Sequence, residues 1–480
     1  MPILSALLAI LLGLSAVTPT GDPADEHFYP SRSWGSANQT YGAALVDING
    51  DGRPDPLLGW HNDRPASLLV NKGNLTFARA AVPWNFPMDR HACAWGEANG
   101  DGQPDLFCSQ GARSGTGIGP KELWSNDPWR DWAEEAGVDN PLARGRSVNW
   151  LDYDRDGDLD LFTGAVKRDP YGDQLFRNDR GHFTKVNAGI SALRWTQLST
   201  TADWNRDGWP DLLLIQGIDK NTVRAFVNRH GTFDLVRLPH TRGSWKAAAW
   251  GDYDGDGWPD LNLVSLGRSI ILHNDHRGSF HVVHDTVMVR ARASVWLDVN
   301  NDGLLDLYVV QSAPGPYAGA VGDVSDRLIL QYRPGHFKKV VLSETAGWAG
   351  AGQSVAAGDV NGDHRTDVLV SNGRERWFGR QHLLTNRVRG GGGASVYLRG
   401  TRWNPLGFGA RVRITVGSRV RWTELNDGVS GLSQSSAVVH VSLGSASYAW
   451  VRVLWPNGSC DQIRVGRGAT RRVTIGSTQC

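Results

Sequence analysis

Seven short acidic segments of the chain share one nine-residue pattern of oxygen-bearing side chains. Asp or Glu stands at position 1, Asp or Asn at position 3, and Asp at positions 5 and 9. Position 6 is Gly in six segments and His364 in the seventh. The segments are DINGDGRPD (47–55), EANGDGQPD (97–105), DYDRDGDLD (152–160), DWNRDGWPD (203–211), DYDGDGWPD (252–260), DVNNDGLLD (298–306) and DVNGDHRTD (359–367).

This arrangement of oxygens suits a hard cation, and the chemistry is that of calcium. Magnesium would demand a tighter octahedron, and zinc would prefer His or Cys, which the segments lack apart from His364. Position 12 carries no bidentate Glu, as Leu58 shows in the first copy, so the segments are not EF-hand loops. We therefore predict up to seven Ca²⁺ sites. The predicted ligands, with position 7 contributing its backbone carbonyl, are Asp47, Asn49, Asp51, Arg53 and Asp55; Glu97, Asn99, Asp101, Gln103 and Asp105; Asp152, Asp154, Asp156, Asp158 and Asp160; Asp203, Asn205, Asp207, Trp209 and Asp211; Asp252, Asp254, Asp256, Trp258 and Asp260; Asp298, Asn300, Asp302, Leu304 and Asp306; and Asp359, Asn361, Asp363, Arg365 and Asp367.

The seven copies differ in the ligands they offer. The third and fifth carry the most carboxylates, because Asp154 and Asp254 replace the Asn found elsewhere at position 3. The second uses the longer Glu97 and the seventh replaces Gly by His364, so we expect these two sites to be the weakest. One such segment would be an ordinary turn, but seven copies argue against that interpretation.

The spacing of the segments predicts the elements that hold them. Their first residues lie 50, 55, 51, 49, 46 and 61 residues apart, a period typical of propeller blades. The third period divides into four strand-like runs at 147–153, 159–166, 173–179 and 182–187, with the acidic segment between the first two. We therefore predict an all-β protein with a seven-bladed β-propeller. Trp95, Trp150, Trp250 and Trp296, each two residues before its segment, are predicted to pack between blades.

The seventh period lacks a fourth strand, and the N-terminus offers a replacement. Strands three and four are joined elsewhere by an Asn-x-x-Gly-x-Phe turn, as at Asn178 to Phe183. No such turn follows residues 381–387, whereas residues 26–29 read EHFY, like the start of a fourth strand. We predict that this N-terminal segment completes the seventh blade and removes its exposed edge.

These repeats resemble FG-GAP or VCBS-type repeats, a resemblance that implies a calcium-loaded seven-bladed propeller. After residue 388, Asn404, residues 407–412, residues 433–435, Leu443-Gly444 and residues 455–458 are similar to the pattern of the ASPIC/UnbV domain. Together the two resemblances suggest a protein like the cartilage acidic proteins. That family can carry a C-terminal EGF-like module, which needs many more cysteines than the 4 of this chain.

The predicted organisation is a signal peptide (1–20), a propeller (21–388) and a small C-terminal β domain (389–480). The apolar run from Pro2 to Val17 has the length of a secretory signal and is short for a membrane span. An uncleaved signal anchor is the alternative. The four glycines at 390–393 are predicted to be a hinge or linker.

The four cysteines and three sequons fit a secreted, extracellular protein. An oxidising compartment would pair Cys93 with Cys108, which flank the second acidic segment, and Cys460 with Cys480. Buried free thiols are the alternative. The sequons at Asn38, Asn74 and Asn457 would make the protein a glycoprotein if its source is eukaryotic.

Composition and motifs favour a binding protein over an enzyme. Of 480 residues, 50 are Lys or Arg and 49 are Asp or Glu, which argues against a nucleic-acid partner. Residues 387–480 hold 13 Arg and 3 acidic residues, so the C-terminal domain is strongly basic. No nucleophile elbow, HExxH or dinucleotide motif is present. We predict a non-enzymatic binding or adhesion module, with a calcium-dependent lectin and a polysaccharide lyase as alternatives.

Two groups of side chains are candidate ligand contacts, each with a structural alternative. Trp209 and Trp258 could stack on a sugar or pack against a neighbouring loop. Arg90, Arg146 and Arg292, near the start of first strands, could ring the channel mouth opposite the metals or be solvated. The expected partner is an extracellular protein or an acidic glycan or matrix polymer, with no membrane span after signal cleavage.

Overall fold

The computed structural model describes residues 27–38, 40–60, 64–111, 119–126, 128–166, 169–190, 195–216, 222–276, 278–312, 325–345, 352–373 and 379–480. The predicted signal peptide and the side chain of the Asn38 sequon lie outside the described residues. Strands dominate, and the helices in the described part are α1 (Ala133–Ala136) and a 3-10 turn (Ser343–Thr345). Neither is long and apolar enough to cross a membrane. The all-β prediction is confirmed.

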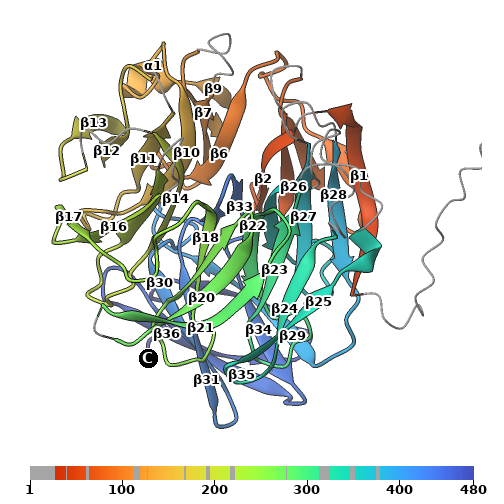
Figure 1. The fold of residues 1–480 in the computed structure, drawn as a ribbon. Helices are drawn as coiled ribbons and strands as arrows, with labels where there is room; N and C mark the ends of the chain where they lie inside the picture. The colour runs from red at the N-terminus through yellow and green to blue at the C-terminus, as the bar shows by residue number, and fades with distance from the viewer. Residues whose placement is uncertain are drawn as a thin grey trace, which may run out of the picture.

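Seven antiparallel sheets repeat one four-strand order among the described residues (Figure 1). The sheets are β2 (Thr40–Val46), β3 (Asp55–Trp60), β4 (Ser67–Asn71) and β5 (Phe77–Arg79); β6 (Arg90–Gly96), β7 (Asp105–Gln110), β8 (Glu122–Asn126) and β9 (Trp129–Asp131); β10 (Gly145–Leu151), β11 (Asp160–Ala165), β12 (Gln174–Asp179) and β13 (His182–Val186); β14 (Thr196–Ala202), β15 (Asp211–Gln216), β16 (Thr222–Asn228) and β17 (Phe233–Val236); β18 (Trp245–Gly251), β19 (Asp260–Ser265), β20 (Arg268–Asn274) and β21 (Phe280–Val287); β22 (Ala291–Leu297), β23 (Asp306–Gln311), β24 (Arg327–Arg333) and β25 (His336–Val341); and β26 (Gly352–Gly358), β27 (Asp367–Asn372), β28 (Gly379–Asn386) and β1 (Phe28–Asn38).

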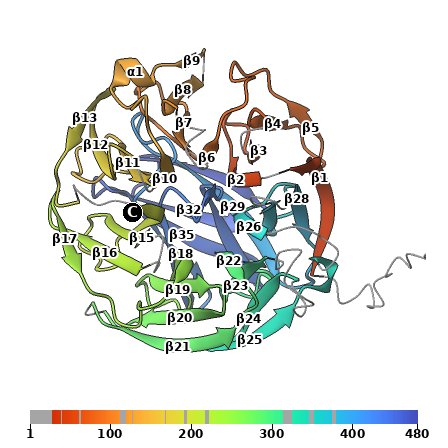
Figure 2. The same cartoon turned by 45° about the horizontal axis from the view of Figure 1, so that its top comes forward.

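The sheets form a closed ring (Figure 2). The innermost strands β2, β6, β10, β14, β18, β22 and β26 contact one another in this order, and β26 contacts β2. The last sheet is completed by the N-terminus, as predicted: Phe28 pairs with Asn386 and Tyr29 with Thr385. The first and last parts of the ring are therefore joined by backbone hydrogen bonds, which leaves no free edge on β28.

Tryptophans fill part of the space between neighbouring sheets. Trp150 is buried, and its Nε1 donates to the carbonyl of Ala94 in the preceding sheet at 3.1 Å. A Cβ on Gly96 would lie 2.4 Å from the Trp150 indole, so Gly is required there. Trp95 is also buried, as predicted, but Trp250 and Trp296 are only half-buried. Both still pack between sheets, as predicted: Trp296 Nε1 donates to Ala249 O of the preceding sheet at 3.2 Å, and the ring of Trp250 is stacked on that of Trp204 at 5.1 Å. Their burial is incomplete because a chamber lies beside them.

Hydrogen bonds from side chains to the backbone also link each sheet to the one before it. The last Asn or Gln of each third strand donates its side-chain N–H to a backbone carbonyl of the preceding acidic segment. In β12, for example, Asn178 Nδ2 donates to Ala98 O at 3.2 Å. The remaining links are Asn71 to Val360, Asn126 to Ile48, Asn228 to Tyr153, Asn274 to Trp204, Gln331 to Tyr253 and Asn386 to Val299. The Asn or Gln of the turn signature thus also links neighbouring sheets around the ring.

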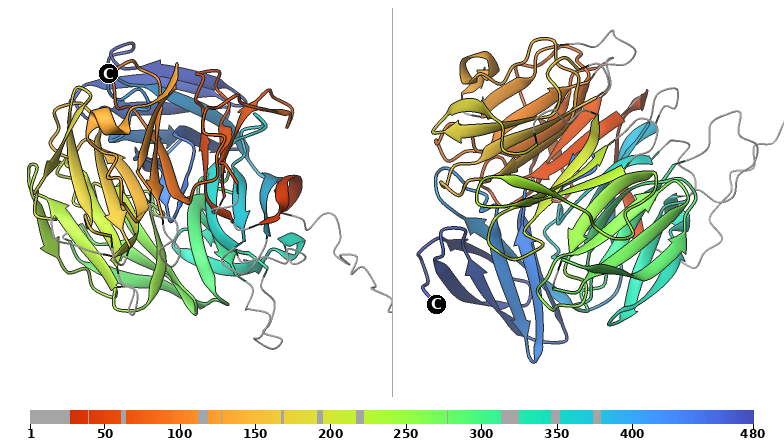
Figure 3. Two further views of the ribbon diagram at one scale, coloured as in Figure 1. Left: turned by 90° about the horizontal axis from the view of Figure 1, so that it is seen from above. Right: turned by 60° about the vertical axis from the view of Figure 1, so that its left-hand side comes forward.

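The C-terminal part forms a second β unit on one side of the ring (Figure 3). One sheet contains β31 (Arg419–Leu425), β30 (Ala410–Val416), β35 (Tyr448–Leu454) and β36 (Cys460–Gly466), and the other contains β34 (Val438–Gly444), β29 (Gly392–Arg399) and β37 (Thr470–Thr474). The short strands β32 (Val429–Ser430) and β33 (Ser433–Gln434) leave this unit and join the sheet of β2.

The four glycines at 390–393 are not a free hinge. Gly391 N donates to Asn300 O at 2.8 Å, and a Cβ on Gly390 would lie 1.8 Å from the same oxygen. A Cβ on Gly393 would lie 2.3 Å from His364 O. The linker prediction is wrong in this respect, because the glycines allow the chain to pack closely against the sixth and seventh acidic segments.

Both predicted disulfides are present. Cys93 and Cys108 lie opposite each other on β6 and β7, with their Cα atoms 4.1 Å apart. Cys460 is bonded to Cys480, which ties the end of the chain to β36. The described residues include no free cysteine.

Candidate metal centres at the acidic loops

Each acidic segment is a loop that joins the innermost strand of a sheet to the second strand. Side chains at positions 1, 3 and 5 accept hydrogen bonds from backbone N–H groups further along the same loop. In the first loop, Gly52 N donates to Asp47 at 2.8 Å, Asp51 N to Asn49 at 2.9 Å and Arg53 N to Asp51 at 3.0 Å. The same three bonds recur in the second, fourth, fifth, sixth and seventh loops. These bonds give the six loops one common shape.

Position 6 requires a left-handed backbone conformation. Gly52 has a φ of 86° and Gly157 a φ of 99°. Glycine adopts such angles without strain, which explains its recurrence there. His364 adopts a φ of 61° in the seventh loop and keeps the donated bond to Asp359. The seventh loop therefore has the same shape despite the substitution.

The position-9 carboxylates are the most buried acids of the loops. Each is at most 1% exposed: Asp55, Asp105, Asp160, Asp211, Asp260, Asp306 and Asp367. Asp55 accepts from Ile48 N at 3.1 Å and from Asn71 N at 2.7 Å, and this pairing recurs in other sheets. Burial raises the pKa of Asp55 to about 7 and that of Asp211 to about 9, although the backbone hydrogen bonds oppose the shift.

Buried carboxylates need compensating positive charge, and the protein supplies little of it here. Among the described residues, Asp260 is the only position-9 side chain with a basic partner, His273 at 3.3 Å. Several buried loop oxygens also have no hydrogen-bond partner within the described part of the chain: Asp152 Oδ1, Asp154 Oδ1, Asp203 Oδ1 and Asp211 Oδ2. A cation at the loops would satisfy both conditions, so the oxygen donors present fit a hard divalent ion.

The third and fifth loops bring carboxylates closest together, as their sequences suggested. Ligand atoms of Asp152, Asp154 and Asp160 lie within 4.8 Å of one another. The same holds for Asp252, Asp254 and Asp256. At position 7 of the third loop, Asp158 accepts from Arg180 N at 2.9 Å, so its carboxylate is engaged by the turn between strands three and four.

Sequence reasoning missed two histidines at the fifth loop. His273 Nδ1 of β20 lies 3.3 Å from both Asp254 Oδ2 and Asp260 Oδ1. His276 is hydrogen-bonded to Asp256. Neither belongs to the nine-residue pattern. The sequence feature that could have indicated them is the His273-Asn274 pair at the end of a third strand. The fifth loop therefore has two histidines from outside its nine-residue segment beside its carboxylates.

Without divalent metal, we expect stability to fall as the pH rises from about 4 to about 7. The pKa values of Asp55 and Asp152 are raised to about 7 by burial, so the folded protein binds more protons than the unfolded chain in this range. Each such group then destabilises the fold by about 1.4 kcal/mol per pH unit. Urea unfolding in EDTA at pH 4.5 and 7 measures this slope, and saturating calcium should flatten it. A metal-free protein whose stability rises toward pH 7 would contradict the expectation.

Trp209 and Trp258 pack against neighbouring loops. The Arg155 guanidinium lies 5.5 Å from the Trp209 ring centre, and His230 contacts the same ring at 5.0 Å. Trp258 is stacked on His276 at 5.0 Å, with Arg206 5.0 Å from its ring centre. In each case the arginine comes from the preceding loop. These contacts correspond to the packing alternative for both tryptophans.

The three arginines that were predicted to ring the channel mouth have different surroundings in the structure. Arg90 is 2% exposed and forms a two-bond ion pair with Glu122, at 2.5 and 2.6 Å. Its guanidinium is thus committed to the fold, and its proposed ligand role is wrong. Arg146 and Arg292 instead line a pocket at the channel mouth, together with Lys246.

The C-terminal unit lies directly on the acidic loops. It contacts each of the seven loops through hydrogen bonds or close packing. The hydrogen bonds, donor first, run from Arg472 to Gly50 O at 2.9 Å, from Arg155 to Pro456 O at 2.6 Å, from Asp203 N to Glu424 at 3.0 Å, from Trp422 N to Asp252 at 3.3 Å and from Arg419 to Asp302 O at 2.6 Å. His364 and Ser395 are hydrogen-bonded at 2.9 Å. At the second loop, Trp403 packs against Gly100. No pattern in the sequence indicated that the two parts meet at the acidic loops.

One segment of this unit, residues 426–436, enters the channel and is here called the clasp. It bonds to every innermost strand in the ring. Asn426 donates to Thr201 O at 2.8 Å, Asp427 accepts from Trp150 N at 2.9 Å, Ser430 donates to Ala248 O at 3.1 Å and Ser294 O at 2.9 Å, Ser433 accepts from Ala43 N at 3.0 Å, Gln434 accepts from Trp95 N at 2.7 Å and Ser435 accepts from Ala357 N at 3.1 Å. The Ser-Gln-Ser motif therefore has a structural role at the centre of the ring.

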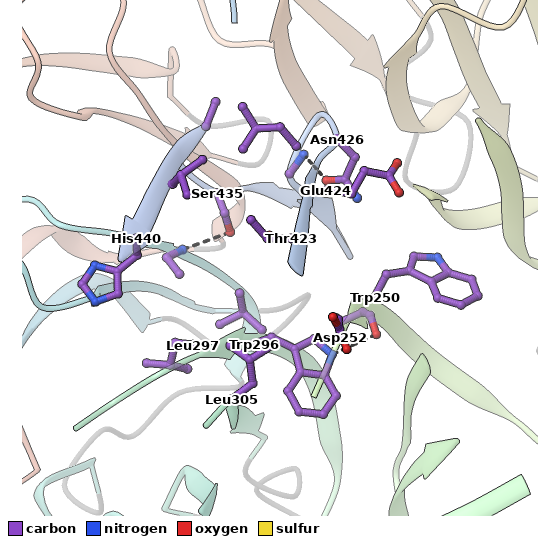
Figure 4. A pocket seen from close by; sticks show the side chains of 18 of the residues that line it. Trp250, Asp252, Trp296, Leu297, Leu305, Thr423, Glu424, Asn426, Ser435 and His440 are labelled. Carbon is purple, nitrogen blue, oxygen red and sulfur yellow. Dashed lines mark hydrogen bonds between the residues drawn. The ribbon is translucent and has the colours of Figure 1, made fainter. Parts of the chain in front are cut away.

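A chamber of about 250 Å³ remains between the ring and the C-terminal unit (Figure 4). Position-1 carboxylates of the fourth to seventh loops line it, including Asp252, together with Trp250 and Trp296. Glu424 and His440 face it from the C-terminal unit. Burial raises the pKa of Glu424 to about 7, with Asp203 adding to the shift. The chamber is continuous with the candidate metal loops, so we treat both as one site.

Fold and loops together define a β-propeller of acidic-loop repeats whose loop face is covered by a second β unit. Family comparison gives the same result. FG-GAP-like repeats match residues 47–108, 152–214, 203–263, 252–309 and 298–370, and an FG-GAP repeat matches residues 351–397. The ASPIC and UnbV family matches residues 400–479. The chain belongs to the FG-GAP-like repeat family and carries a C-terminal ASPIC/UnbV domain, which confirms the predicted resemblance.

Solved structures with a similar fold are distant in sequence. An Agrocybe aegerita lectin that recognises non-reducing terminal N-acetylglucosamine is 17% identical over 65% of this chain and 81% of its own, with a TM-score of 0.44. BBS1N, solved in complex with ARL6DN, is 9% identical over 76% and 99%, with a TM-score of 0.47. The Photorhabdus luminescens Tc holotoxin pore is 16% identical over 75% and 14%, with a TM-score of 0.35. No curated protein matches the sequence. These similarities carry no functional argument.

Proposed function

We propose that the protein is a secreted, calcium-binding propeller that acts as a non-enzymatic binding or adhesion module. The observation that carries this proposal is the set of seven position-9 carboxylates, all at most 1% exposed and all but one without a basic partner among the described residues. Calcium would neutralise them through the residues at positions 1, 3, 5, 7 and 9. Because the C-terminal domain lies on the same loops, the bound ions would also hold this domain in position on the ring.

Secretion is supported by the two disulfides, which form and persist in oxidising compartments. Asn74 and Asn457 stand in exposed turns, where a glycan could be attached without disturbing the core. In this proposal the loop carboxylates hold cations and take no part in acid–base chemistry. The partner would be an extracellular protein or an acidic glycan or matrix polymer.

The lectin alternative in its predicted form depends on Trp209 and Trp258, which already contact an arginine and a histidine each. A glycan array with and without calcium, run beside the Trp209→Ala/Trp258→Ala variant, tests this alternative. We expect any calcium-dependent hit to persist in the variant. Loss of the hits would favour the lectin, and release of unsaturated sugar ends from an acidic polysaccharide would overturn the non-enzymatic proposal.

A further inference from the structure

The channel mouth opposite the acidic loops is lined by equivalent residues of successive strands. In each of β10, β14, β18, β22 and β26, the pairing register shifts between the first and third residues. The second residues of these strands are Arg146, Gln197, Lys246, Arg292 and Gln353, and all five line one pocket. Since the acidic loops follow the other ends of these strands, the pocket lies at the far end of the channel.

The pocket is small and closed from below. Its volume is about 40 Å³, and Gly431 and Leu432 at the tip of the clasp form part of its lining. One water needs about 10–15 Å³ of such space, so the pocket has room for a few waters or for one small polar group such as a carboxylate with a neighbouring hydroxyl. The ligand would therefore insert one group and leave the rest of its chain outside.

The lining of the pocket is cationic and, in the part of the chain that the structure describes, includes no acidic residue. Three buried acids of the ring are engaged elsewhere: Glu122 with Arg90, Asp173 with Thr196, and Asp326 with Tyr308. The guanidinium groups of Arg146 and Arg292 at one mouth favour an anion, because its binding relieves their mutual repulsion.

Three polar atoms of the lining are buried without a hydrogen-bond partner among the described residues. They are Arg146 Nε, Arg292 Nε and Gln353 Oε1. Two are donors and one is an acceptor. A carboxylate accepts from guanidinium groups, often through two parallel bonds, and a neighbouring hydroxyl can donate to an amide oxygen.

We propose that this pocket binds the carboxylate and adjacent hydroxyl of a uronic acid residue at the end of an acidic polysaccharide. The inference rests on the proposed function as an extracellular binding module and names its ligand. An Asp or Glu side chain of a protein partner would supply the carboxylate but no hydroxyl beside it. The uronic acid therefore matches the donors and the acceptor of the pocket together.

Surface plasmon resonance in calcium with an immobilised uronic acid tetrasaccharide tests the proposal. We expect binding that weakens as salt rises. The Arg146→Gln/Arg292→Gln variant should lose about tenfold or more in affinity, because two charge-assisted contacts are removed. The matched control is Arg224→Gln/Arg237→Gln, which removes the same charge from exposed positions and should stay within about twofold. Melting temperatures of all proteins show whether each variant is folded.

Three results would overturn the proposal: no binding by the folded wild type, equal losses in both variants, or binding of the carboxyl-reduced tetrasaccharide at equal strength. Binding of an acidic peptide in place of the tetrasaccharide, with the same loss in Arg146→Gln/Arg292→Gln, would assign the pocket to a protein partner and overturn it as well. The calcium-dependent melting temperature is a separate readout, so failure here is distinguishable from failure of the proposed function.

Discussion

Chelation of divalent metal is expected to lower the free energy of unfolding by about 10 kcal/mol relative to calcium at ten times its dissociation constant. Each site contributes about 1.4 kcal/mol under that condition, and the chain has seven loops. The physical reason is that carboxylates such as Asp306 and Asp367 are fully buried or nearly so and lose their counter-ion. Chemical unfolding in EDTA and in calcium, followed by tryptophan fluorescence, measures the difference.

Two loop variants sharpen this test. Asp160→Asn removes a buried carboxylate of the third loop and should reduce the calcium effect by about 1.4 kcal/mol, one site's share. Asp179→Asn changes an exposed acid that is paired with Arg177, and it should leave the calcium effect unchanged. Identical unfolding curves with and without calcium would contradict the account of the loops.

Truncation of the clasp is expected to have the second largest effect. Gln434→Ala removes two hydrogen bonds to the backbone of Trp95, whose N–H and carbonyl are buried inside the ring. Leaving both unpaired should destabilise the protein by about 2–4 kcal/mol. Asp427→Ala should act similarly, because Asn149 Nδ2 and Trp150 N lose their acceptor. Urea unfolding reports the loss in both variants.

Limited proteolysis shows whether the clasp also seats the C-terminal domain. In the Gln434→Ala protein, cleavage near residues 387–391 should become faster, since the domain would detach more often from the ring. Asn457→Ala, an exposed turn residue of the same domain, serves as the control. If the control and the clasp variants unfold at the same urea concentration, the clasp does not hold the ring and the domain together.

Local patterns predicted the ring well because each of its repeats carries its own signals. The acidic segments mark the turn after every innermost strand, and EHFY at residues 26–29 predicted the strand that completes the last sheet. The disulfide across β6 and β7 followed from two cysteines on either side of one turn. In these cases the interacting residues are close in sequence or repeat at a fixed period.

The covering of the loops could not be predicted from such signals. Ser433 and Ala43 are 390 residues apart, and a serine in a polar stretch has no feature that indicates a buried partner. The glycines at 390–393 were interpreted as flexible, although their lack of side chains serves close packing on Asn300 and His364. His273 could not be predicted as a neighbour of the metal ligands, because only the fold brings β20 next to the fifth loop.

Equilibrium dialysis of the chelated full chain against calcium counts the ions that the loops bind. We expect five to seven bound ions, the lower figure applying if the second and seventh loops remain empty. Asp154→Asn/Asp160→Asn should remove one ion from that count without changing the others. Fewer than five bound ions at millimolar calcium, with the protein folded, would show that the acidic loops are not calcium sites as a set.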